Sequence, residues 1–399
     1  AYLFDARYEL KSDLYPANVC YNIALAFQRT AQTQHYAETS NDFTFQAKTT
    51  RPEKNREVYV MVIGETSRAA NWSIYGYNRN TNPELTKIKG LTAFSHVLTE
   101  SNTTHKSVPM LMSSVTAHDF NSIYRQKGII TAFKEAGYRT AFFSNQRYNH
   151  SFIDFFGKEA DICDFIKEDT GDGSYNPSDD ELLKLVAAEL AENASKQFIV
   201  LHTYGSHFNY RERYPADHAF FLPDFPVDAE LKYKDNLINA YDNSIRYTDN
   251  FLARLIRMLQ EQDIDAAMLY TSDHGEDIFD DDRHLFLHAS PVPSYYQIHV
   301  PFLVWMSDNY RKNYPDLFKN AEINRQKNIS SSASFFQTML ELGGIDTPSR
   351  NDSLSVINAS YTEKNRVYLN DHNEARSLND IGMREEDFTM LQTKGIVYR

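Results

Sequence analysis

Five short apolar segments constrain the fold of this chain more than any other feature of its sequence. The first, "VYVMVIG", occupies residues 58–64, and the others lie at 139–144, 197–203, 266–272 and 300–307. A strand with one solvent-exposed face alternates polar and apolar residues, whereas a continuously apolar strand is covered on both faces. We therefore expect five buried strands.

Segments with the apolar period of a helix lie between these strands. They occupy residues 129–138, 178–193, 231–262 and 331–344. The first should stop at Gly137, and the second opens with Ser178 and Glu181 at the spacing of a capping box. Alternating helices and buried strands predict an α/β fold with a mostly parallel central sheet and helices on both faces.

The fourth expected strand runs directly into "TSDHGE", residues 271–276. Asp273, His274 and Glu276 are poor core residues, because a buried charge is costly unless it is paired or bound to a metal. The carboxyl ends of the strands are also where α/β proteins place ligands. We interpret this stretch as the first sign of a metal site.

Two other strands end in residues of the same kind. Glu65 follows the first strand, and His202 and His207 lie in "HTYGSH" at the end of the third. Parallel strands bring these ends to one edge of the sheet, so carboxylates and imidazoles from three distant segments should meet there. Oxygen and nitrogen ligands without thiolates suit Zn²⁺, and Mn²⁺ stays open. Taken singly, each residue also fits a helix cap or an ordinary core position.

A nucleophile for such a site is offered by "ESNTTHKSVPML", residues 100–111. Its polar part precedes an expected helix with Pro109 in the first turn, where a hydroxyl would face backbone N–H groups suited to phosphate. A capping hydroxyl explains the same pattern. His284 and His288, spaced by four, could share a helix face and fold back to the site, or lie in a surface loop.

Composition narrows the function classes. The 399 residues carry 54 acids against 41 bases, a formal net charge of −13, which argues against nucleic-acid binding. The two cysteines, Cys20 and Cys163, form no zinc-binding pattern, and we expect both to be free. No apolar run is long enough for a transmembrane helix. The opening thirty residues are amphipathic and aromatic-rich, which fits either a packing helix or a segment at a membrane surface.

The ordered motifs "VIGETSRAANWSIYGYNRNTNPEL", "TTHKSVPM", "HTYGSH", "SDHGE" and "LHASP" resemble those of the phosphoethanolamine transferases of the alkaline phosphatase/sulfatase superfamily. The resemblance spans residues 58 to about 306. It implies an alkaline phosphatase/sulfatase-like fold. It also implies roles for individual residues, each carried over from a matching position.

In that family pattern the metal ligands correspond to Glu65, Asp273 and His274, and the nucleophile at the metal corresponds to Thr104. The resemblance implies one or two Zn²⁺ ions. His207 and His288 match histidines that handle the phosphate group or a second zinc, and they are the expected catalytic partners of Thr104. The expected substrate-binding residues are Asn145, Gln146, His202, His207 and His288.

The implied reaction transfers phosphoethanolamine from phosphatidylethanolamine to lipopolysaccharide or another cell-surface glycan through a phosphothreonine. Residues 51–399 would be a periplasmic catalytic domain, and residues 1–50 would lead from an N-terminal transmembrane domain in the bacterial inner membrane. We expect a monomer. Ser101 and Met110 stand about where lipid A-modifying members often carry cysteines, so acceptors other than lipid A are favoured.

Other activities remain open at this stage. A phosphoglycerol transferase would also use a threonine, usually with Mn²⁺. A sulfatase or phosphodiesterase-type hydrolase would share the fold, although a sulfatase would need a cysteine or serine followed by an arginine that "TTHKSVPM" lacks. A binding domain that has lost catalysis is the alternative from another class, and it would not need to hold zinc.

Overall fold

The computed structural model describes residues 17–53, 56–167 and 176–398. Its central feature is a seven-stranded sheet, whose strands lie in the order β3-β11-β8-β2-β7-β5-β6. In that order the strands are Leu91–Phe94, Phe302–Met306, Asp265–Ser272, Glu57–Gly64, Lys196–His202, Arg139–Ser144 and Ile162–Phe165.

The expected parallel core of the sheet is confirmed. β2 pairs in parallel with β7 and β8, and β5 pairs in parallel with β7 and β6. β11 departs from the expectation, because it runs antiparallel to both β8 and β3 and makes the sheet mixed. β3 and β6 were not predicted, since both are four residues long and only partly buried, which weakens their apolar signal.

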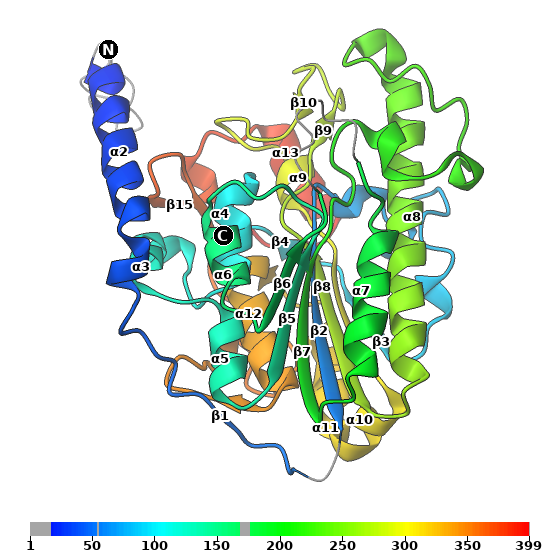
Figure 1. Ribbon diagram of the computed structural model, residues 1–399. Coiled ribbons are helices and arrows are strands. Elements are labelled where there is room, and N and C mark those ends of the chain that lie inside the picture. Colours follow the sequence, from blue (N-terminus) through cyan, green and yellow to red (C-terminus); the bar gives the residue numbers. More distant parts are fainter. Residues whose placement is uncertain (1–16, 54–55, 168–175, 399) are drawn as a thin grey trace.

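Helices cover both faces of the sheet, as expected (Figure 1). α4 (Thr104–Leu111), α5 (Ile129–Glu135) and α12 (Ser331–Leu342) contribute to the core on one face, and α7 (Asp180–Ala191) and α8 (Lys234–Gln260) to the core on the other. β2 supplies alternate residues to the two cores, with Tyr59, Met61 and Ile63 on one side and Val58, Val60 and Val62 on the other. This double burial explains its continuously apolar sequence.

The four helices predicted between or after the strands, at residues 129–138, 178–193, 231–262 and 331–344, are all present, with local corrections. Gly137 follows α5 with a φ of +86°, a left-handed conformation that ends the helix. The predicted capping box of α7 is wrong. The N-cap is Asp179, and the Ser178 hydroxyl lies 2.9 Å from the Tyr247 hydroxyl instead. α8 begins at Lys234, because residues 231–233 form a tighter 3₁₀ turn.

The N-terminal part begins with α2 (Ala17–Gln34) and α3 (Tyr36–Thr39), and the first sixteen residues of the expected lead-in lie outside the described residues. Tyr36 and Phe45 are buried in the main core. Cys20 and Cys163 are both free, as expected. Among the described helices, none combines the length and apolar character needed to cross a bilayer.

Shorter elements complete the domain. The remaining helices are α6 (Phe152–Gly157), α9 (Tyr295–Ile298), α10 (Asp308–Asn313), α11 (Pro315–Asn324) and α13 (Glu385–Thr393). The remaining strands are β1 (Lys48–Thr49), β4 (Val97–Leu98), β9 (Asp277–Ile278), β10 (Phe286–Leu287), β12 (Ile329–Ser330), β13 (Ile345–Asp346), β14 (Val367–Leu369) and β15 (Ala375–Ser377). All of these strands form small two-stranded pairs outside the main sheet.

Candidate metal and nucleophile site

The three central strands deliver the expected residues to one edge of the sheet. Gly64 of β2 lies opposite Ser272 of β8, and Ile63 lies opposite His202 of β7. Glu65 follows β2 directly, and Asp273 and His274 follow β8. Parallel pairing therefore brings residues more than 200 positions apart in the sequence into one buried cluster, because all three strands end at the same level.

Glu65, Asp273 and His274 form a group that could hold a metal ion. Each offers a ligand atom, these atoms lie within 4.8 Å of one another, and all three residues are buried. Asp273 Oδ1 accepts the backbone N–H groups of Thr66 and His274, at 3.0 and 2.8 Å. Its other oxygen, Oδ2, is buried and accepts no hydrogen bond.

The electrostatics of the cluster favour a cation. Burial, together with the charge of Asp273, raises the pKa of Glu65 well above its usual value, and burial raises the pKa of Asp273 to about 6. Burial also lowers the pKa of His274, which keeps its imidazole neutral. Two buried carboxylates without a basic side chain among them are unfavourable unless a cation compensates them. The residues present therefore fit a divalent metal.

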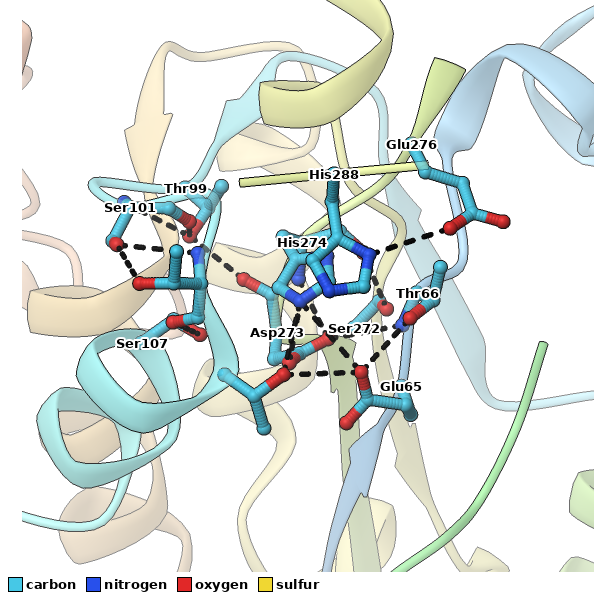
Figure 2. A network of polar contacts seen from close by, with 12 residues as sticks. Glu65, Thr66, Thr99, Ser101, Ser107, Ser272, Asp273, His274, Glu276 and His288 are labelled. Carbon is cyan, nitrogen blue, oxygen red and sulfur yellow. Dashed lines mark hydrogen bonds and ion pairs between the residues drawn. The ribbon is translucent and has the colours of Figure 1, made fainter. Parts of the chain in front are cut away.

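The tautomer of His274 is suited to metal binding. Its Nδ1 lies 2.9 Å from the Gly275 carbonyl oxygen, so Nδ1–H donates there and Nε2 keeps its lone pair. Nε2 lies 3.2 Å from Asp273 Oδ2 and 3.6 Å from Glu65 Oε1. Figure 2 shows His274 above these two carboxylates.

Thr104 lies directly against this cluster. Its Oγ1 is 3.1 Å from Glu65 Oε1 and 3.0 Å from His274 Nε2, so one hydroxyl proton faces two acceptors. Thr104 is the first residue of α4, and its N-cap Thr103 makes no side-chain cap bond. The helix thus begins earlier than predicted, and Pro109 lies in its interior rather than its first turn. The expected place for a nucleophile at a helix N-terminus is nevertheless present.

A pocket of about 190 Å³ opens in front of Thr104. Its lining includes Gln146, Lys167, His202, Tyr204 and His207. The Gln146 amide donates to Glu65 Oε2 at 3.3 Å and to the Thr203 carbonyl at 3.0 Å. Gln146 therefore contacts Glu65 of the candidate metal cluster and also lines the pocket.

The two histidines of "HTYGSH" lie in different surroundings. His202 ends β7, is fully buried, and has no hydrogen-bond partner on either ring nitrogen. Burial lowers its pKa to about 3, and its Nε2 is 4.0 Å from Glu65 Oε2. His207 stacks on Tyr204 and directs Nδ1 at the Phe208 carbonyl at 2.6 Å, which leaves Nε2 for other partners.

His288 reaches the site, but not on a helix. The predicted helix face shared by His284 and His288 is wrong, because the segment forms β10 (Phe286–Leu287) and irregular loop. The His288 ring lies 4.1 Å from the His274 ring, and its Nδ1 is 3.4 Å from Glu276 Oε2. Figure 2 shows His288 between His274 and Glu276. Loop packing, rather than helical spacing, brings it there.

Glu276 is completely buried and helps to hold His288. Although burial of the His288 ring opposes its charge, the hydrogen bond and charge of Glu276 raise its pKa above the usual value. Arg68 holds the segment that contains Glu276, because its Nη1 donates to the Glu276 carbonyl at 3.0 Å and to Asp280 Oδ2 at 2.6 Å. Sequence reasoning missed Arg68, although it stands three residues after Glu65 in "GETSR".

Asn145 precedes the pocket residue Gln146, and its amide N–H groups donate within the protein, whereas its amide oxygen is buried without a hydrogen-bond partner. Asn145 donates to Asp179 Oδ1 at 2.8 Å and to the Pro177 carbonyl at 3.0 Å. Asp179 in turn accepts the N–H groups of Tyr204 and Gly205. Lys167, whose Nζ lies 3.3 Å from the Tyr204 ring centroid, was also missed, because nothing around it in the sequence marks it as a site residue.

Comparison with known proteins finds phosphoethanolamine transferases among the relatives of this chain. The Kdo(2)-lipid A phosphoethanolamine 7''-transferase of Escherichia coli is 32% identical over 301 residues, which cover 72% of this chain and 50% of that protein. Phosphoethanolamine transferase EptC of Escherichia coli is 26% identical over 318 residues, which cover 77% of this chain and 54% of that protein. The chain thus spans about half the length of the curated relatives it matches.

Solved structures agree on the fold. The C-terminal periplasmic domain of EcEptC from Escherichia coli, in complex with Zn, aligns with a TM-score of 0.76 at 24% identity. The alignment covers 86% of this chain and 97% of that domain, so the expected alkaline phosphatase/sulfatase-like fold is confirmed. The family model described as Sulfatase matches residues 57–345, which include Glu65, Thr104, Asp273 and His274 of the candidate site. The chain therefore belongs to the sulfatase family.

Proposed function

We propose that this chain is the catalytic domain of a zinc-dependent phosphoethanolamine transferase. One observation carries the proposal: the Thr104 hydroxyl lies 3.1 Å from Glu65 and 3.0 Å from His274, at the edge of a buried metal-type cluster. A hydroxyl in that place is set up as a nucleophile rather than as a cap. The named activity of the curated relatives supports phosphoethanolamine as the transferred group.

Zn²⁺ is the ion that the donors suit best. Two carboxylates and one neutral imidazole, with no thiolate, match a catalytic zinc site that keeps one position open. Glu65, Asp273 and His274 would hold the ion. When bound, zinc would lower the pKa of a neighbouring hydroxyl and stabilise negative charge on phosphoryl oxygens.

The reaction that we propose is a double displacement. Thr104 Oγ1 attacks the phosphorus of phosphatidylethanolamine, its bond to phosphorus forms, and the bond to the glycerol oxygen breaks, so that diacylglycerol leaves with a proton. An acceptor hydroxyl or phosphate oxygen then attacks the phosphothreonine and restores Thr104. Each half-reaction transfers the same phosphoethanolamine group and leaves the electron count unchanged.

His207 and His288 are the groups that we propose for proton transfer. Each commits Nδ1 to the protein, His207 to the Phe208 carbonyl and His288 to Glu276, which leaves Nε2 for substrate. Gln146 and His202, which line the pocket in front of Thr104, are proposed to contact the head group, with Asn145 shaping the pocket behind them.

The acceptor that we propose is lipopolysaccharide or another surface glycan, in keeping with the named acceptor of one relative. The donor is a membrane lipid, so we also propose that the domain works on the periplasmic side of the inner membrane. A phosphoglycerol transferase is the second candidate, because the same threonine and metal cluster would serve phosphatidylglycerol equally well. A sulfatase is disfavoured by the threonine at position 104.

The test is the intact mass of the zinc-loaded protein before and after incubation with phosphatidylethanolamine vesicles. We expect a gain of one phosphoethanolamine, absent in Thr104→Ala and retained in the matched variant Thr103→Ala, which removes the adjacent hydroxyl. A gain of phosphoglycerol from phosphatidylglycerol vesicles, with none from phosphatidylethanolamine, would replace the proposed donor. An adduct that survives in Thr104→Ala would overturn the proposed nucleophile.

A further inference from the structure

We propose that Asn102 is a positioning residue that fixes Thr104 relative to His288. Asn102 lies two residues before Thr104 and is 2% exposed. It touches neither the metal-type cluster nor the pocket in front of Thr104 by any contact found in the described residues. The proposal rests on the proposed function in one respect, namely that Thr104 is the nucleophile.

The side chain of Asn102 uses all of its amide hydrogen-bonding groups. Nδ2 donates to Gln297 Oε1 at 2.5 Å and to the Ser290 carbonyl at 2.9 Å. Oδ1 accepts the hydroxyl proton of Tyr368 at 2.6 Å. A buried amide held by three bonds in three directions has one orientation, because any rotation would leave buried polar groups unpaired.

One of these side-chain bonds, together with a backbone bond, links Asn102 to the segment that follows His288. Ser290 accepts from the Asn102 side chain, and the Ala289 N–H donates to the Asn102 backbone carbonyl at 3.3 Å. The residues next to His288 are therefore tied to the residue two positions before Thr104. Asn102 thus sets the separation between the nucleophile and the expected proton-transfer histidine.

Gln297 connects Asn102 to the segment after β8, which carries Asp273 and His274. Its Nε2 donates to Asp277 Oδ2 at 2.5 Å and to Ser290 Oγ at 2.9 Å, and its carbonyl accepts the Gly275 N–H at 2.8 Å. Asp277 also accepts the Ser294 hydroxyl at 2.7 Å. The Asp277–Gln297–Asn102 chain therefore joins the segments on either side of the site, and Asn102 is the member nearest to Thr104 in sequence.

The test uses turnover of bis(p-nitrophenyl) phosphate by the zinc-loaded protein, a phosphodiester that needs no membrane. We expect Asn102→Ala to lower kcat about 100-fold with KM nearly unchanged, because a misplacement of about 1 Å has that effect on a reacting group. Zinc content should stay that of the wild type. Tyr368→Phe, which removes only one of the three bonds, should lower kcat less and keep the fold.

The matched control is Asn324→Ala. Asn324 is also 2% exposed and donates two amide bonds, to the Val356 and Asn358 carbonyls, at 2.9 and 3.0 Å. It should lose similar thermal stability without losing kcat. Equal kcat in Asn102→Ala, Asn324→Ala and wild type would overturn the proposal. A wild type that turns over no phosphodiester and forms no Thr104 adduct would instead count against the proposed function.

Discussion

Thr104 donates toward Glu65 across 3.1 Å, although 39 positions separate the two residues in the chain. Glu65 is placed by the end of a central strand, and Thr104 by the start of a helix that packs on that sheet. The hydroxyl and the carboxylate lie close together because β2 ends, and α4 begins, at the same edge of the sheet. This contact joins the candidate metal cluster and the proposed nucleophile in one site, and the predictions below test what stabilises that site.

Asp273→Asn should make the metal-free protein more stable but weaken its binding of zinc. Asparagine can still accept the Thr66 and His274 N–H groups, but it removes one of two buried carboxylates whose pKa values burial raises. When a chelator has removed all metal, the free energy of unfolding of the variant, measured in urea, should exceed that of the wild type by about 1–3 kcal/mol.

Zinc should reverse that order. At 100 times its dissociation constant, zinc would stabilise the wild type by about 2.7 kcal/mol, and the variant should gain little because it lacks a ligand. Thermal unfolding with and without zinc gives both numbers. Equal zinc stabilisation of the two proteins would remove Asp273 from the ligand set.

Gly205→Ala should weaken metal binding through the backbone. Gly205 has a φ of +49°, and a Cβ there would lie 2.6 Å from the Glu65 carbonyl oxygen and 2.9 Å from its nitrogen. Glu65 would have to move, so we expect a 10- to 100-fold loss of zinc affinity, about the effect of losing a supporting contact. Competition with a chromogenic chelator measures it.

Gly76→Ala is the matched control for that variant. Gly76 also has a left-handed φ, of +91°, but a Cβ there would meet no atom within 4 Å. Both variants should lose about 1–2 kcal/mol to backbone strain, and Gly76→Ala should keep its zinc affinity. A similar loss of affinity in both would mean that strain alone, rather than contact with Glu65, is responsible.

Glu100→Gln should give a pH-dependent change in stability. Burial raises the pKa of the Glu100 carboxyl from 4.5 to about 7, and its Oε2 has no hydrogen-bond partner. Because the folded-state pKa is raised, the stability that protonation contributes is present below pH 4.5 and lost as the pH rises through about 7. The free energy of unfolding of the variant, relative to wild type, should rise by about 2–3 kcal/mol between pH 5 and pH 8. A constant difference across that range would show that Glu100 ionises normally.

Lys196→Met should destabilise the fold without changing the catalytic rate of the folded protein. Lys196 forms a buried ion pair with Glu57, which also accepts the hydroxyls of Tyr59 and Tyr138 at 2.7 and 2.8 Å. Removing one partner leaves an uncompensated carboxylate, at a cost of about 3 kcal/mol. Glu57 opens β2, at the opposite end from the site, so kcat per folded molecule should be unchanged. The double variant Glu57→Gln, Lys196→Met should recover most of the lost stability.

The parallel core and the residues at its carboxyl edge could be predicted because their signals are local. β2 and β8 are buried on both faces and read as apolar runs, and Glu65, Asp273 and His274 follow at once. Once strands with this pattern pair in parallel, their ends must meet. The sequence by itself therefore determined the sheet core, its helical layers and the expected metal cluster.

Tertiary structure alone decided the rest. The residues of β11 do not indicate that it runs antiparallel to its neighbours, because an apolar strand is equally buried in a parallel or an antiparallel pairing. His288 reaches His274 through an irregular loop, and Asn102 joins that loop to the segment before Thr104. Such contacts depend on the packing of several distant segments at once. The periodicity of a few residues specifies whether a segment forms a helix or a strand, but only the packed core specifies the positions of the loops between these elements.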